Sequence, residues 1–137
     1  MVIAYAEEAI WKILADSGAV GAICGDRIYP NVTPANPTYP LVVYDRIDGP
    51  RVRALGGESG LAHPRIQVTC WATSYSAVKA LAAAVKTALD DYAGTVDSFV
   101  VSDIEFQDDG DMPDISPGNL ALRLYGVRQD YIVWHQE

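Results

Sequence analysis

Four of the eight prolines in this chain lie within the eleven residues from Pro30 to Pro40. Proline has no amide N–H to donate, and it disfavours helical backbone at the residue before it. This segment therefore cannot be helical and is predicted to be a stiff, extended connector. The segment Leu41–Ile47, which begins with the β-forming residues Leu-Val-Val-Tyr, follows the connector immediately and predicts a first strand.

Hydrophobic periodicity predicts the other elements. Residues 65–72 alternate as in a strand with one apolar face, and two segments have apolar residues at helical spacing. Ser74 or Ser76 can cap the second helix. Gly18 is expected to end the first helix, with at most one helical turn after it, and Gly126 to mark a bulge or bend. The predicted elements are helices over about 4–15 and 74–90, strands over 41–47, 65–72 and 99–107, and a last strand or strand pair over 120–134.

This order of elements predicts an α+β fold, with a single mostly antiparallel sheet of four to five strands and two main helices packed on one face. The polar, Gly-rich span Asp48–Pro64 has no sustained period and is expected to form a long protruding loop or hairpin arm. With 137 residues and no internal repeat, residues 1–137 are expected to form one domain.

The charge balance argues against DNA as a binding partner. The formal net charge is −8, with ten Lys and Arg residues against eighteen acidic ones, whereas DNA affinity comes mostly from neutralising phosphates. A local basic patch stays an open alternative. No apolar run approaches the ~20 residues that span a bilayer, and the N-terminus lacks the basic start of a signal peptide. Action or assembly in the cytoplasm is the expectation.

Motifs for catalysis, cofactors and metals are not found. The Gly-rich segment 56–60 is not followed by the helix pattern and Lys-Ser/Thr pair of a phosphate-binding loop. Cys24 and Cys70 are too isolated for a zinc site or a disulfide framework and are expected to be buried. His63, at a loop end, and His135, near the C-terminus, are not expected to form a catalytic or metal pair. We therefore expect no enzyme activity, no cofactor and no metal site.

Charge is segregated along the chain. Residues 103–114 include six acidic and no basic residues, and residues 46–65 contain four of the ten basic ones. The acidic stretch fails as an EF-hand, because Ser116 would replace the bidentate Glu; a solvated loop and an improvised cation site are the alternatives. Each segment alone is typical of an exposed loop, but together they suggest head-to-tail contact between copies. The candidate interface residues are Arg46, Arg51, Arg53, Arg65, Asp103, Glu105, Asp108, Asp109, Asp111 and Asp114.

Four segments, in order, resemble the tail-completion family of long-tailed bacteriophages, whose members are similar to tail-to-head joining or tail-terminator proteins. They are "GDRIYP" (25–30), "YPLVVYDRI" (39–47), "PRIQVTCWATSYSAVKALAAAVKTAL" (64–89) and "RLYGVRQDYIVWH" (123–135). Together they extend over nearly the whole chain. The resemblance rests on their order, since none of the four is a catalytic motif.

The resemblance implies a structural virion protein that forms a ring, with six copies expected, at the head-proximal end of the tail. There it would stop growth of the tail tube and join the tail to the capsid. The implied partners are further copies of the chain, the major tail tube protein and the head-completion or neck proteins. Genomic DNA would only pass through the lumen, and no membrane is involved. The implied location is the virion, at the head–tail junction, with the host cytoplasm during assembly.

Other functions stay open at this stage. A head-completion (stopper) protein of the neck is the nearest alternative, followed by a small soluble ligand-binding or adaptor domain and by an enzyme with an unfamiliar site. The connector has two interpretations as well. It could form part of a contact between subunits, or it could simply wrap one edge of the sheet, where prolines discourage stray pairing.

Overall fold

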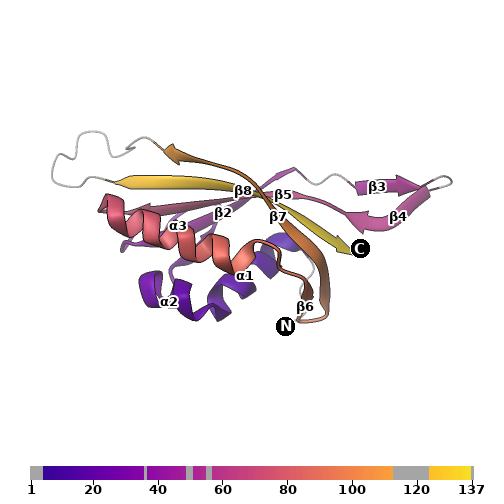
Figure 1. Ribbon diagram of the computed structural model, residues 1–137, viewed down its shortest axis with the longest axis horizontal. Coiled ribbons are helices and arrows are strands. Elements are labelled where there is room, and N and C mark those ends of the chain that lie inside the picture. Colours follow the sequence, from indigo (N-terminus) through magenta and orange to yellow (C-terminus); the bar gives the residue numbers. More distant parts are fainter. Residues whose placement is uncertain (1–4, 36, 49–50, 55–56, 113–123, 137) are drawn as a thin grey trace.

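A computed structural model describes residues 5–35, 37–48, 51–54, 57–112 and 124–136, with the backbone alone described at 48, 51–54 and 57–61. The helices lie together on one side of a long, twisted sheet (Figure 1). They are α1 (Ala6–Asp16), α2 (Gly18–Cys24) and α3 (Tyr75–Leu89). The strands are β1 (Ile28–Pro30), β2 (Leu41–Asp48), β3 (Arg51–Ala54), β4 (Gly57–Ala62), β5 (Arg65–Ala72), β6 (Gly94–Val96), β7 (Phe99–Met112) and β8 (Tyr125–Gln136).

Strand β8 is the centre of the sheet. On one edge it pairs with β5 over most of its length and with β4 near its C-terminal end, and on the other edge it pairs with β7. The strand order is β1-β2-β5-β8-β4-β3, with β7 beside β8 and β6 beside β7. Strands β1 and β2 are parallel, and the other pairs of described strands are antiparallel.

Strands β2 to β5 form one long hairpin. Asp48 pairs with Arg65 at the end of the β2–β5 ladder, and Arg51 pairs with Ala62 at the start of the β3–β4 ladder. Each strand advances by three residues between these two pairs, so the register continues from the end of the first ladder to the start of the second, although each ladder has one irregularity, between Arg46 and Asp48 and between Val52 and Arg53. The base of this hairpin lies within the sheet, and its tip, strands β3 and β4, projects beyond the helices (Figure 1). We call β3 and β4 the arm.

The main core lies between the helices and the sheet. Helix α3 buries a stripe that includes Leu81, Val85 and Leu89, and the Ser74 hydroxyl caps its first turn by accepting a bond from the Ala77 amide at 3.2 Å. Alternate residues of the strands face this layer, since side chains in a strand alternate between faces. The buried residues of β5 and β8 on this side are Ile66, Val68, Cys70, Ala72, Val127, Tyr131 and Val133.

A buried chain of hydrogen bonds links β8 to α3. The Tyr131 hydroxyl donates to Oε1 of Gln129 at 2.9 Å, and Nε2 of Gln129 donates to the backbone oxygen of Ala82 at 2.9 Å. Both side chains are almost completely buried, at 0% and 2% exposure. A buried polar group is costly unless it is paired, so these contacts fix the position of the helix on the sheet.

The proline-rich connector is the crossover between two parallel strands. Ile28 of β1 pairs with Val42 of β2, and the chain then returns over residues 31–40 to begin β2 at Leu41. A parallel pair needs a crossover, which is usually helical; here its described residues, 31–35 and 37–40, are in neither helix nor strand, in keeping with the prolines. Tyr39 of the connector packs against a small apolar cluster on the helix-free face. Leu41, Val43, Trp71 and Leu124 form this cluster. The end of the connector thus packs on the helix-free face, and both the wrapping of a sheet edge and a contact with another subunit stay predictions.

The α+β class, the helices on one face and the hairpin arm are confirmed, but several details differ from the sequence-based prediction. The described sheet has eight strands rather than four or five. The strand predicted to end at residue 107 continues to Met112, so the first part of the predicted acidic loop is strand. Helix α2 has seven residues, and it begins at Gly18 rather than after a left-handed Gly18. The positive φ of 62° falls instead at Gly25, which ends α2.

Gly126 does not mark a bulge, because the β5–β8 register is continuous past it. A Cβ atom at this position would lie 2.6 Å from Cζ3 of Trp71 and 2.9 Å from Cβ of Met112. Glycine is therefore required because the indole ring and β7 approach the backbone of β8 at this point. The rest of the predicted last strand, residues 120–123, lies outside the described residues.

We predict that Gly126→Ala lowers the free energy of unfolding by about 1–3 kcal/mol, because the added methyl group overpacks the space under Trp71. The matched control is Gly21→Ala in α2, where a Cβ atom would meet nothing within 4 Å. The control should raise stability by up to about 1 kcal/mol through helix propensity. Urea unfolding followed by circular dichroism measures both; equal stability of Gly126→Ala and the parent chain would contradict the packing argument.

Candidate assembly interface

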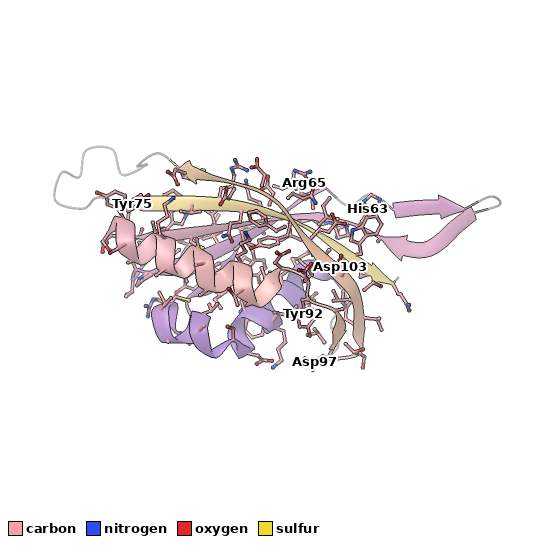
Figure 2. All side chains as sticks on the ribbon, viewed as in Figure 1. His63, Arg65, Tyr75, Tyr92, Asp97 and Asp103 are labelled. Atoms are coloured by element: carbon pink, nitrogen blue, oxygen red, sulfur yellow. The ribbon has the colours of Figure 1, made fainter. Side chains whose placement is uncertain are left out.

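The face of the sheet opposite the helices carries a row of charged side chains. Side chains along β8 alternate between the two faces of the sheet. Val127 and Tyr131 point toward the helices, so Arg128 and Asp130 point to the helix-free face. The register places Arg128 between Thr69 of β5 and Gly110 of β7. Figure 2 shows Arg65 on the same side of the sheet, away from the helices.

Asp130 is the centre of this charge cluster. Its Oδ2 accepts a hydrogen bond from Nη1 of Arg128 at 2.9 Å and lies 3.6 Å from Nη1 of Arg65. The residue is only 8% exposed, and its other oxygen, Oδ1, is buried with no hydrogen bond among the described residues. A buried carboxylate is strongly unfavourable unless cations balance it. The two guanidinium groups therefore stabilise an acidic group that would otherwise disrupt this face.

Arg128 continues the cluster onto β7. Its Nη2 lies 4.0 Å from Oδ2 of Asp108, and a Cβ atom at Gly110 would lie only 2.8 Å from Nη2. The absence of a side chain at Gly110 thus leaves the space that the guanidinium occupies. The cluster links β5, β8 and β7 across the helix-free face.

The base of the arm is fixed by an aromatic contact. His63, which joins β4 to β5, stacks on Trp134 of β8 with ring centroids 4.6 Å apart. Nε1 of Trp134 donates to Oε1 of Glu105 on β7 at 2.8 Å, and the Val133 amide donates to the backbone oxygen of Pro64 at 3.0 Å. Figure 2 shows His63 where the arm leaves the sheet.

The predicted basic residues fall into two groups. Arg46 lies with its Nη1 3.8 Å from Oε2 of Glu7 in α1, and Arg65 approaches Asp130. Arg51 and Arg53 lie in β3, where their backbones pair with β4; their side chains are outside the described part of the structure. The structure therefore assigns two of the four arginines to contacts inside the chain and places the other two on the projecting arm.

The predicted acidic residues lie along β7. Oδ1 of Asp111 is 2.6 Å from Nζ of Lys79 on α3, while Asp108 and Glu105 have the partners described above. Asp103 and Asp109 make no ion pair with the residues that the structure describes. Asp114 lies outside the described residues. Arg128 and Asp130 were not predicted as site residues from the sequence; their i, i+2 spacing on the polar face of the last strand was the available signal.

The two cysteines contribute no reactive group at the surface. Cys24 and Cys70 are free and completely buried, and burial raises the pKa of both thiols. Within the described residues, no three His, Cys, Asp or Glu side chains are grouped so that they could hold a metal ion. No described helix has the length and apolar character needed to cross a membrane.

A surface groove of about 400 Å³ lies where the ends of α1 and α3 meet β6. Lys12 and Asp16 line it and pair with each other at 3.2 Å, and Tyr92 and Asp97 line its other side. Figure 2 shows Asp97 at the turn from β6 to β7 and Tyr92 near the end of α3.

A family model described as "Tail completion protein gp17" matches residues 8–136. The chain belongs to this family. Eighteen chains of solved structures match significantly. One of them, from a structure titled "Virion of native gene transfer agent (GTA) particle", aligns with a TM-score of 0.77 at 15% sequence identity, covering 98% of this tail-completion protein and 100% of that chain. At this identity the likeness shows the fold alone. No match was found among curated proteins.

We predict that Arg128→Ala lowers the unfolding free energy of this tail-completion protein by about 1–3 kcal/mol, because it removes the closest cation from the buried Asp130. The matched control is Lys79→Ala, whose partner Asp111 is mostly exposed. The control should have a clearly smaller effect, since surface ion pairs contribute little. Urea unfolding measures both; equal losses would show that burial of Asp130 is not what makes Arg128 important.

We also predict that Cys24 and Cys70 react slowly with a thiol reagent at pH 8 in the folded protein and rapidly in urea. Their raised pKa values leave little thiolate in the folded state. Because the folded pKa lies above the unfolded one, the thiols' contribution to stability is fully present below about pH 8.5 and is lost as the pH rises further. Fast labelling of the folded chain would contradict the burial of these thiols.

Proposed function

We propose that this chain forms a ring, of six copies, at the head-proximal end of a phage-type tail. In this proposal the ring stops growth of the tail tube and joins the tail to the capsid. Its partners are further copies of itself, the major tail tube protein on one side and the head-completion or neck proteins on the other. Membership of the tail-completion family supports the tail location. The likeness of the fold to a chain of a gene transfer agent virion supports a role as a particle component.

The arm is the observation that carries the ring proposal. Its outer part, from Arg53 to Glu58, pairs only within itself in the described structure, and β3 is the last strand of the sheet order. A two-stranded hairpin alone is marginally stable in water, so an arm of this kind gains most from packing against another molecule. In a ring, every arm would find the same surface on the next copy.

The charge of the chain fits passage of DNA through such a ring. With a net charge of −8, the protein lacks the excess of cations that would bind phosphates along the duplex. The proposal therefore involves no sequence-specific DNA contact. It also includes no catalytic step, in keeping with a structural family. The virion is the proposed final location, with assembly in the host cytoplasm.

The test is deletion of the gene in the particle-producing cell, followed by electron microscopy of the lysate. We predict separate heads and tubes, with tubes of uncontrolled length, and recovery of joined particles when the parent gene is supplied on a plasmid. The Gly21→Ala variant serves as a complementation control, since it adds a methyl group in open space. Joined particles of normal length in the deletion would overturn the proposal. Tubes of normal length beside unjoined heads would contradict the terminator role and favour a stopper of the neck.

A further inference from the structure

Beyond its first residues, the outer edge of β7 is not covered by another strand of the described chain. Strand β6 pairs only with residues 99–101 of β7. The loop after α3 covers the next part, because the Asp91 amide donates to the Ile104 oxygen at 2.9 Å and Oδ1 of Asp90 accepts from the Phe106 amide at 3.2 Å. Residues 107–112, which we call the acidic edge, have β8 on one side and no described strand on the other.

The two faces of the acidic edge differ in chemistry. Asp111 contacts Lys79 of α3, so positions 109 and 111 lie on the helix side of the sheet. Met112 packs in the apolar cluster on the helix-free face, and Gly110 lies beside Arg128 there. The acidic edge thus presents Asp109 and Asp111 on the helix side, and Asp108, Gly110 and Met112 on the helix-free face, where Asp108 approaches Arg128.

Strand β3 has the complementary pattern. Its sequence is Arg-Val-Arg-Ala over residues 51–54, and alternation puts positions 51 and 53 on one face and positions 52 and 54 on the other. One edge of β3 pairs with β4, and the other has no partner among the described strands. Exposed strand edges are ready to accept another strand, and main-chain hydrogen bonds supply affinity in such contacts.

The arm and the acidic edge lie at opposite ends of the molecule (Figure 1). An arm therefore cannot reach the acidic edge of its own chain. A contact between the two surfaces is head-to-tail, and head-to-tail contacts close into a ring when the rotation allows it.

We propose that β3 of one copy adds as a strand to the acidic edge of β7 in the next copy. Arg51 and Arg53 then face Asp109 and Asp111, and residues 52 and 54 face the Gly110–Met112 side. Opposite charges on directly opposed strand positions stabilise pairing, whereas like charges oppose it. The inference rests on the proposed function for its ring, and it adds which two surfaces join and which charges favour their contact.

The test is a charge exchange in the same complementation assay. Arg51→Glu with Arg53→Glu should reduce the number of joined particles about tenfold or more, and Asp109→Arg with Asp111→Arg should do the same, because each turns attraction into repulsion. The variant with all four substitutions should restore at least a third of the parent count. The control, Lys12→Glu, adds negative charge on α1, away from the arm and from the acidic edge, and should act as the parent chain does.

Several results would overturn the inference. It is wrong if either charge variant joins particles normally, or if the fourfold variant stays as defective as the single-surface variants. If only the variant Arg51→Glu with Arg53→Glu is defective, and the variant with all four substitutions does not restore joining, the arm binds a different protein. Hydrogen exchange gives a second readout: amides of residues 51–54 and 107–112 should exchange more slowly in isolated tails than in the free chain. If these amides exchange equally fast in isolated tails and in the free chain, the contact between β3 and the acidic edge is rejected. If the gene deletion still abolishes joining, the ring function stands without that contact.

Discussion

The pairing of β8 on both of its edges is the constraint on which the rest of the structure depends. Through β5 it holds the base of the long hairpin, and through β4 it holds the start of the arm. Through β7 it supports a strand whose charged residues have poor intrinsic preference for a sheet. The bond from Gln129 to the backbone of α3, supported by the bond from the Tyr131 hydroxyl to Gln129, then fixes the helical layer on this strand. Displacing β8 would therefore separate the arm, the acidic edge and the core from one another.

The charges of the chain serve two different purposes. On the helix-free face, two guanidinium groups, those of Arg65 and Arg128, balance the carboxylate of Asp130. They stabilise the subunit by preventing an unpaired buried charge rather than by net attraction. Asp109 and the arginines of β3 are not part of this cluster, and they lie at opposite ends of the molecule. The buried cluster thus stabilises the subunit, whereas in the proposal the residues of the arm and of the acidic edge select a neighbour. In this account, complementary exposed charges set the register between copies, and main-chain pairing supplies the affinity.

Much of the fold could be predicted because local signals were strong. Strand β5 has the predicted bounds, and Ser74 caps α3 as its sequence context indicates. Strands β1 and β6 have only three residues each, too short for a periodic pattern. The extension of β7 through Asp108–Met112 was missed because tertiary pairing with β8 overrides the low strand propensity of Asp and Gly. The pairing of Lys79 with Asp111 was missed because the two residues are distant in sequence, and the pairing of Arg128 with Asp130 was missed although the two are only two residues apart.

The most direct measurement is a density map of the head–tail junction in the assembled particle that carries this chain, at a resolution that separates strands. The account predicts a closed ring in which β3 of each copy continues the sheet of its neighbour beyond β7. A ring whose arms point toward the tube or the neck, with the outer edges of β7 open to solvent, would contradict it.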